Sequence, residues 1–311
     1  MERVNCDLCG SNDPRPLFDR IDRFTDNDFK FVKCAQCGLI YLNPRPTQSE
    51  IVEFYPDNYE SYKLLDYDNS SIQNWHIQRM LQTLLDFVEK FVNVRGHLLD
   101  IGCATGRFLI TARDRGWEVK GVELVEKAAQ IARQEYLLDV TIGSFESVSL
   151  PENYYGVITL WDVLEHTQSP SLTLKKIFSI LKPSGWLIMN IPNAHSIDRR
   201  LFGPHWMGFD PPRHLFVIPK DTLRDMLHKA GFEPRYWKSF LPSYFSFAMS
   251  LERWLALRSP TPAKFVGRIS TFPGLRFIFE PYFALANRLL LSGLITVFAQ
   301  KPPLEKRHET T

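Results

Sequence analysis

The segment from residue 98 to residue 108, LLDIGCATGRF, combines residue types that suit a nucleotide-like ligand. A short apolar run carries Asp100 near its end and enters a turn with glycines at Gly102 and Gly106. A strand that stops at such a turn and restarts as a helix brings backbone N–H groups close to the ligand. A second acid, Glu123, follows twenty-one residues after Gly102 at the end of the next apolar run. An acid there can accept hydrogen bonds from both hydroxyls of a ribose.

Four of the five cysteines form two Cys-x-x-Cys pairs, each followed by glycine: Cys6 with Cys9, and Cys34 with Cys37. Two such turns are typical of a zinc knuckle, because the glycine lets the backbone curl beneath the sulfurs. Four thiolates close the tetrahedral shell of Zn²⁺, so we expect a structural zinc ribbon over residues 1–43. An iron site or unligated thiols are the alternatives. The segment mixes acids and bases without a basic run, which favours a platform or oligomerisation role over RNA binding.

The composition is ordinary for a globular chain and sets few limits on function. The 311 residues are 44% hydrophobic and 23% charged, with a formal net charge of +2. This balance gives no electrostatic case for a nucleic-acid partner, which usually requires a strongly basic face. The first residues lack the apolar core of a signal peptide, so we expect a cytoplasmic protein with reduced thiols.

Strand and helix signals alternate from residue 95 onward, which predicts an α/β fold with a parallel sheet and helices on both faces. The predicted strands are His97–Ile101, Glu118–Val122, Val140–Ile142, Gly156–Trp161, Trp186–Ile191, Glu233–Lys238 and Gly293–Gln300. The predicted helices are Ser71–Val92, Arg107–Arg115, Glu126–Leu137, Ser171–Leu181 and Pro219–Ala230. Ligands bind at the carboxyl ends of such strands, where residues 102–106, 123, 144 and 162 fall.

The chain divides into five predicted parts. They are the zinc ribbon (1–43), a linker with N-terminal helices (44–94), the ligand-binding core (95–240), an aromatic-rich helical insert (241–290), and the last strand with the C-terminal tail (291–311). The charge-free run Ser239–Leu251 is shorter than the ~18–20 apolar residues that span a bilayer. Arginines and lysines alternate with the aromatic side chains of the insert. This mixture suits a lid over a hydrophobic pocket, a homodimer contact or peripheral contact with a membrane.

Over residues 95–240 and the final strand, the sequence resembles the class I S-adenosylmethionine-dependent methyltransferases. The motifs that carry the resemblance are DIGCATGRF (100–108), VEL (122–124), GSFESV (143–148), WDVLEH (161–166), LKPSGWLIMNIPN (181–193) and KAGF (229–232). The resemblance implies a Rossmann-like seven-stranded sheet with helices on both faces. The spacing Gly102-x-x-x-Gly106 also differs from the G-x-G-x-x-G of a nicotinamide-dependent dehydrogenase.

The resemblance assigns contacts with S-adenosylmethionine residue by residue. Contacts with the methionine and ribose would come from Asp100, Gly102, Cys103, Ala104, Gly106, Trp161, Asp162, Val163 and Glu123. Contacts with the adenine would come from Leu124, Ser144 and Phe145. Ser144 stands where many relatives carry an acid, so a hydroxyl or a backbone carbonyl must serve there. We interpret Cys103 as a small packing residue rather than a nucleophile.

Methyl transfer is an in-line displacement at the sulfonium, and an alcohol acceptor also needs a base for its proton. Histidine titrates near neutrality and is the natural candidate. His166 ends the WDVLEH motif, and His214 lies beside Arg213 in the loop 203–216, where Arg213 would clamp an anionic acceptor. The alternatives are a histidine that closes a turn, and an Arg213 that pairs with Asp210 to brace the loop.

Two further likenesses bear on the acceptor. WDVLEH followed by Leu-Lys-Pro-x-Gly resembles small-molecule methyltransferases, including the ubiquinone-pathway O-methyltransferases. The ribbon followed by Asn-Pro-Arg-Pro-Thr (43–47) resembles methyltransferases of polysaccharide or natural-product pathways, some of which methylate deoxysugars on a nucleotide carrier. We expect O-methylation of a small-molecule, glycosyl or lipid-linked acceptor. C- or N-methylation, RNA methylation through the ribbon and a non-catalytic scaffold that binds S-adenosylmethionine are the alternatives.

Overall fold

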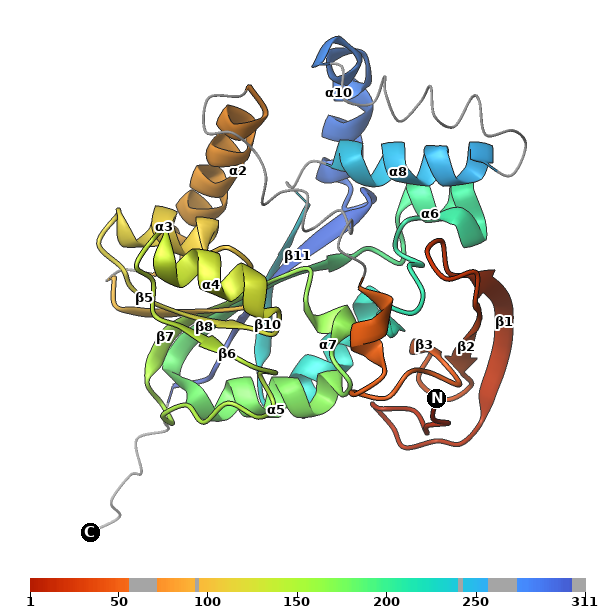
Figure 1. The fold of residues 1–311 in the computed structure, drawn as a ribbon, viewed down its shortest axis with the longest axis horizontal. Helices are drawn as coiled ribbons and strands as arrows, with labels where there is room; N and C mark the ends of the chain where they lie inside the picture. Colours follow the sequence, from red (N-terminus) through yellow and green to blue (C-terminus); the bar gives the residue numbers. More distant parts are fainter. Residues whose placement is uncertain (56–71, 93–94, 240–242, 257–272, 304–311) are drawn as a thin grey trace.

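A seven-stranded sheet forms the centre of the protein (Figure 1). The computed structural model describes residues 1–55, 72–92, 95–239, 243–256 and 273–303. The strands of this sheet are β4 (His97–Ile101), β5 (Glu118–Glu123), β6 (Val140–Ile142), β7 (Tyr155–Trp161), β8 (Leu181–Pro192), β10 (Glu233–Lys238) and β11 (Leu294–Gln300). Their order is β10-β11-β8-β7-β4-β5-β6. The prediction of a Rossmann-like seven-stranded fold is confirmed.

The sheet is not parallel throughout, which corrects one expectation. Strands β4 to β8 pair in parallel, but β11 runs antiparallel to both β8 and β10. The alternation of strands and helices ends before residues 241–290. The alternating pattern therefore does not predict the direction of the last strand, which follows that segment. The parallel strands bring their carboxyl ends to one edge, where β4, β5 and β7 lie side by side.

Helices cover both faces of the sheet, as predicted (Figure 1). On one face lie α2 (Ile72–Glu89), α3 (Arg107–Arg113) and α4 (Glu126–Gln134), and on the other α5 (Pro170–Ile180) and α7 (Lys220–Lys229). The sheet has a hydrophobic core on each face, and successive residues of β4 point into different ones. Leu98 packs in a cluster with Leu85 and Leu109, while Leu99 packs in a cluster with Ile177 and Leu223. This is the alternation expected of a buried strand.

Several predicted boundaries move by a few residues, as element ends commonly do. The helices predicted over Arg107–Arg115 and Glu126–Leu137 end at Arg113 and Gln134. The strand predicted from Trp186 begins at Leu181, because Leu181 already pairs with Tyr155 of β7.

The N-terminal segment folds into a second sheet that is joined to the core. Its strands are β1 (Pro14–Ile21), β2 (Asp28–Cys34), β3 (Ile40–Leu42) and β9 (Phe216–Val217). The fourth strand comes from the core segment, with Tyr41 opposite Phe216 and Ile40 opposite Val217. The boundary drawn at residue 43 therefore cuts through a shared hydrophobic cluster. Asp7 adds a further tie, since its carboxylate accepts a hydrogen bond of 2.8 Å from the backbone N–H of Ser171 in α5.

The described parts of residues 241–290 are helical, as expected. Helices α8 (Ser243–Ala256) and α10 (Pro273–Arg288) pack with α6 (Ile197–Phe202) at the top of Figure 1. Phe247 of α8 joins the three, with its ring 5.2 Å from that of Phe202 and 5.8 Å from that of Phe279. The described residues contain no helix long and apolar enough to cross a bilayer. Residues 257–272 of the predicted insert, 56–71 of the linker and 304–311 of the tail lie outside the described residues.

Candidate active site

The glycine loop follows β4 directly and leads into α3, as the sequence predicts. Gly102 has a φ of 72°, and its N–H donates to the carbonyl of Val122 at 2.8 Å. A Cβ at Gly102 would lie 2.5 Å from Cγ2 of Val163, so the position requires glycine on both counts. Gly106, with a φ of 78°, forms the N-cap of α3. The loop is thereby pressed against the residues that follow β7.

Glu123 holds the glycine loop from the end of β5. Its Oε2 accepts the N–H of Ala104 at 2.8 Å, and its Oε1 accepts the N–H of Val125 at 2.8 Å. The side chain is nearly buried, and burial raises the pKa of its carboxyl. Each carboxylate oxygen can accept a second hydrogen bond. The carboxylate that was predicted to hold the ribose hydroxyls therefore also braces the loop, and it keeps acceptor capacity for a ligand.

Asp100 lies in the middle of the site, within β4. Its Oδ1 accepts a hydrogen bond of 2.6 Å from the hydroxyl of Thr159. Burial, helped by the charge of Glu123, raises the pKa of Asp100 to about 7, although the bond from Thr159 opposes that shift. A carboxyl in this state gains from a cation close by. The predicted contact with the methionine ammonium would supply one.

The other predicted donor-site residues gather around the same strand ends. Cys103 is buried, and burial raises the pKa of its thiol, which fits a packing role. Leu124 is 46% exposed at the end of β5, so its side chain presents an apolar surface outside the core. The Ser144 hydroxyl donates to that of Ser147 at 3.1 Å, and Phe145 is buried with the ammonium of Lys176 4.8 Å from its ring.

The residues after β7 complete this side of the site. The ring of Trp161 meets that of Phe108 edge to face at 5.3 Å. Asp162 has a φ of 56°, and its Oδ1 accepts a hydrogen bond of 2.6 Å from the amide of Asn190. Val163 fills the space left by the missing side chain at Gly102. Tertiary folding thus brings the VEL and WDVLEH motifs, which are separate in the sequence, against the glycine loop.

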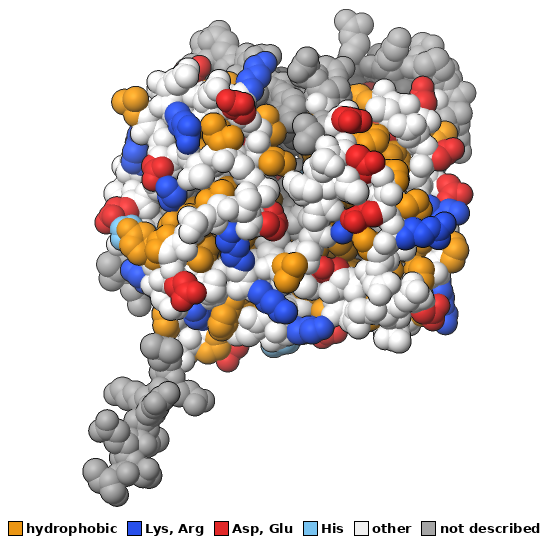
Figure 2. All heavy atoms as spheres, turned by 60° about the horizontal axis from the view of Figure 1, so that its bottom comes forward, with side chains coloured by type: hydrophobic (Ala, Val, Ile, Leu, Met, Phe, Trp, Pro, Cys, Tyr) orange, Lys and Arg blue, Asp and Glu red, His pale blue; other side chains and the backbone are white. Residues whose placement is uncertain are grey.

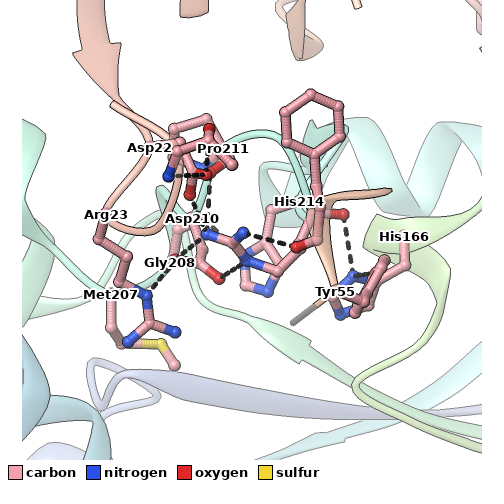
Figure 3. A network of polar contacts seen from close by, with 12 residues as sticks. Asp22, Arg23, Tyr55, His166, Met207, Gly208, Asp210, Pro211 and His214 are labelled. Carbon is pink, nitrogen blue, oxygen red and sulfur yellow. Dashed lines mark hydrogen bonds and ion pairs between the residues drawn. The ribbon is translucent and has the colours of Figure 1, made fainter. Parts of the chain in front are cut away.

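Arg213 is placed as a brace and not as an anion clamp, which corrects the preferred sequence prediction. Its side chain is fully buried, and its guanidinium pairs with Asp22 at 2.6 Å and Asp210 at 2.8 Å (Figure 3). It also donates to the carbonyls of Phe54 and Pro211. Burial alone would raise the pKa of Asp210, but the charges of Arg253 and Arg213 outweigh it and hold that pKa well below its usual range. The bracing alternative describes these contacts.

The two candidate histidines come together, which the sequence did not predict. The rings of His166, in the short helix η2 (Leu164–His166), and His214 lie 4.7 Å apart. Nδ1 of His166 lies 2.9 Å from the carbonyl of Arg213 and 3.2 Å from the hydroxyl of Tyr55 (Figure 3). Nδ1 of His214 lies 2.9 Å from the carbonyl of Gly208. Burial lowers the pKa of His166 to about 3 and also lowers that of His214. Both imidazoles are therefore neutral near pH 7.

Two residues of this region were missed by sequence reasoning. Glu165 belongs to the WDVLEH motif but was given no role; its side chain is 1% exposed, and a carboxylate oxygen lies within 4.8 Å of a ring nitrogen of both His166 and His214. Tyr55 reaches His166 from far along the chain. The Leu-Glu-His order of the motif was the only signal for Glu165, and no local signal marked Tyr55.

The four cysteines of the N-terminal pairs converge, although they come from two turns far apart in sequence. Sγ of Cys6 lies 3.3 Å from that of Cys37, and Sγ of Cys9 lies 3.5 Å from that of Cys34. All four sulfurs lie within 4.8 Å of one another. A tetrahedral ion with bonds of about 2.3 Å places its sulfurs roughly 3.8 Å apart. The donor set and its spacing therefore fit Zn²⁺.

Comparison with known proteins identifies the class of protein to which this fold, with its site at the strand ends, belongs. The family model described as a methyltransferase domain matches residues 73–236, and the chain belongs to this family. Two proteins named ubiquinone biosynthesis O-methyltransferase are similar to it. That of Nitrosospira multiformis is 26% identical over 118 residues, and that of Bordetella avium is 28% identical over 150 residues.

The similarity to these relatives is partial. The alignments cover 36% and 44% of this chain and 49% and 62% of the relatives, so the chain spans about half the length of the curated relatives it matches. Among solved structures, the [4+2]-cyclase SpnF covers 84% of this chain and 98% of its own, with a TM-score of 0.55 and 19% identity. That likeness shows the fold alone, and a cyclase on this fold illustrates that the fold does not fix the chemistry.

The buried ion pairs of Arg213 predict a large loss of stability on truncation. Arg213→Ala would remove the ion-pair partner of buried Asp22 and one of the arginines that pair with Asp210, and we expect a loss of about 3–5 kcal/mol in the free energy of unfolding. Urea unfolding followed by circular dichroism measures it.

Arg224→Ala is the matched control, because Arg224 also pairs with an aspartate three residues away but on an exposed helix face. We expect a change within about 0.5 kcal/mol for this variant. Equal losses in the two variants would show that Arg213 is not the brace described above.

Proposed function

We propose that the protein transfers a methyl group from S-adenosylmethionine to a hydroxyl of a small-molecule, glycosyl or lipid-linked acceptor. The observation that carries the proposal is the glycine loop between Asp100 and Glu123 at the ends of adjacent strands, in a chain of the methyltransferase domain family. Membership of the family supports the donor. The names of the two O-methyltransferase relatives support a hydroxyl acceptor.

In this proposal the donor lies along the carboxyl edge of β4, β5 and β7. Glu123 accepts hydrogen bonds from the ribose hydroxyls, and Asp100 faces the methionine ammonium. Leu124 covers one face of the adenine. Asp162 and Val163 would border the methionine end, and His166 follows them in the same motif. Alignment of donor and acceptor supplies most of the rate enhancement in such a displacement.

The acceptor proton must leave as the new bond forms. The Nδ1 atoms of His166 and His214 face carbonyl oxygens, which only accept, so each Nδ1 donates and each Nε2 carries a lone pair. A neutral imidazole can take a proton from a hydroxyl, but burial makes each of these two a weaker base than a free imidazole, and His166 the more so with its pKa of about 3. N-methylation of a neutral amine would use the same donor site without requiring this group, whereas C-methylation would also need a base to take a proton from the acceptor.

The helices of the insert support a lid over the acceptor side more than a membrane contact. The hydroxyl of Ser250 in α8 accepts the backbone N–H of Met207 at 2.9 Å. Arg253 of α8 donates to Asp210 at 2.9 Å. Both contacts tie α8 to the loop that carries His214. A homodimer contact through the insert stays a prediction.

Charge distribution supports the expectation of no nucleic-acid partner. On the face in Figure 2, basic and acidic side chains are interspersed, and neither sign dominates. Nucleic acids usually bind to a stripe of clustered basic side chains. The proposal therefore assigns the ribbon a platform role, with a structural Zn²⁺ held by Cys6, Cys9, Cys34 and Cys37.

The donor site predicts that Glu123→Gln weakens binding of S-adenosylmethionine at least about tenfold. The amide loses one acceptor oxygen and so loses either the brace to the loop or a ribose hydrogen bond. Isothermal titration calorimetry with S-adenosylmethionine measures the dissociation constant. Glu118→Gln, at the exposed start of the same strand, is the control and should bind like the wild type. A folded wild-type protein that does not bind S-adenosylmethionine would overturn the proposed function.

Asp100 predicts a pH dependence of donor binding. Because burial raises its pKa to about 7, the carboxyl becomes neutral as the pH falls through 7 and loses its attraction for the methionine ammonium. We expect the affinity of the wild type to fall by up to about tenfold per pH unit below that point.

Two variants test this assignment. Asp100→Asn should bind more weakly and show no such fall. Thr159→Val should move the fall to higher pH, because the hydrogen bond that opposes the pKa shift is lost. A wild-type affinity that is flat between pH 5.5 and pH 7 would contradict the role of Asp100.

The ribbon predicts that Cys9→Ser combined with Cys37→Ser removes one equivalent of zinc from the purified protein. Loss of the ion should also lower the melting temperature, because metal binding contributes directly to the folding of such sites. Elemental analysis measures the zinc content. Cys103→Ser is the control and should keep its zinc, since Cys103 lies outside the cluster. Unchanged zinc in the double variant would refute the assignment.

A further inference from the structure

A second group of metal-ligand side chains lies beside the proposed acceptor position. In the part of the chain that the structure describes, one cluster of potential ligands is the four cysteines, and another is Glu165, His166 and His214. One ligand atom from each of these three residues lies within 4.8 Å of the other two. Glu165 and His166 come from η2, and His214 comes from the loop before β9.

Glu165 is the first observation that points to a ligand. Its side chain is 1% exposed, and neither carboxylate oxygen has a hydrogen-bond partner among the residues that the structure describes. A buried carboxylate without a partner is costly, and native structures rarely leave one so. The group therefore requires either a proton or a cation close by.

The orientation of the histidines is the second observation. Each Nδ1 donates to a backbone carbonyl, that of Arg213 for His166 and that of Gly208 for His214. Each Nε2 then carries the lone pair that a metal needs. A metal-bound histidine almost always donates its other N–H to a carbonyl or carboxylate, which fixes the tautomer and the ring. Both rings already have this arrangement.

The backbone holds the three ligands together. The N–H of Leu215 donates to the carbonyl of Glu165 at 2.9 Å, and the N–H of His214 donates to the carbonyl of Asp210 at 2.9 Å. Arg213 precedes His214 in the chain and is anchored by its buried ion pairs with Asp22 and Asp210. The segment with His214 is therefore fixed directly against η2.

We propose that Glu165, His166 and His214 bind a divalent first-row transition-metal ion. Two histidines and one carboxylate form a set of N and O donors that suits Zn²⁺, Fe²⁺, Co²⁺ and Mn²⁺, and it leaves coordination positions open. Ligand atoms on one ion lie about 3–4 Å apart, so rotations that move the side chains by roughly 1 Å close the site.

Binding of the ion does not depend on the proposed function, but its use does. The open positions would face the acceptor, and a hydroxyl bound to a divalent ion loses its proton more readily than a free one. The ion would then replace an imidazole as the group that activates the acceptor oxygen. This use rests on the proposed methyl transfer to a hydroxyl.

Metal titration of the full-length protein tests the proposal. Metal-stripped wild type is titrated with Co²⁺, and bound equivalents are counted by elemental analysis after desalting. We expect two equivalents. The ribbon equivalent should show the strong near-ultraviolet absorption of cobalt thiolates, and the second should show only the weak visible bands of N and O ligands.

Four variants, one of them a control, separate the sites. Glu165→Gln and His214→Asn should each lose the second equivalent, or bind it at least tenfold more weakly, and keep the thiolate absorption. His228→Asn, an exposed histidine of α7, is the control and should keep both equivalents. The cysteine double variant should lose the thiolate absorption and keep the second equivalent. Circular dichroism checks that each variant is folded.

Two results would overturn the proposal. One is a wild type that takes up a single equivalent, at the thiolates, which would mean that Glu165 carries a proton instead. The other is a folded Glu165→Gln that retains the second equivalent with wild-type affinity. Calorimetry with S-adenosylmethionine on the same preparations is independent of both, so a protein that binds cobalt but not S-adenosylmethionine would refute the proposed function and leave the metal site standing.

Discussion

The arrangement around the candidate active site depends on one buried ion-pair network. Arg213 has no exposed surface and pairs with Asp22 of the N-terminal unit and Asp210 of its own loop. Arg253 from α8 adds a further ion pair to Asp210. Three parts of the chain that lie far apart in sequence therefore share a single set of charges. Breaking such a network leaves uncompensated charges in the interior, so these parts are held in one mutual arrangement.

This network explains why the N-terminal unit is more than an appended module. β3 pairs with β9, and β9 follows directly on the segment with Arg213 and His214. The same pairing that completes the small sheet sets the position of His214 next to η2. A structural zinc in the cysteine cluster would stiffen this sheet without touching the chemistry. In this view, the ribbon influences the acceptor side through the backbone hydrogen bonds between β3 and β9.

The donor side is built on a different principle. Here the carboxyl ends of parallel strands meet, and the glycine loop, Glu123 and Asp162 follow from the direction of the strands alone. Glu123 ties its own strand to the loop of the neighbouring strand through the N–H of Ala104. Under the proposed function, the donor site is local to the sheet, while the acceptor side is assembled from the loop, the insert and the N-terminal unit. The acceptor side can therefore differ among proteins that share the donor side.

The sequence by itself determined the features that local patterns encode. Periodicity gave the strands and helices, the positions of Gly102 and Gly106 gave the loop, and the two cysteine pairs gave the cluster of four sulfurs. Strand direction then placed Glu123 beside the loop, because carboxyl ends of parallel strands share one edge. Only the tertiary structure decided the antiparallel direction of β11, the pairing of β3 with β9 and the meeting of Glu165 with His214. These depend on contacts between distant segments, and no local spacing records them. For the same reason Arg213 looked like an exposed clamp in a polar loop, whereas its partner Asp22 lies in the N-terminal unit and buries it.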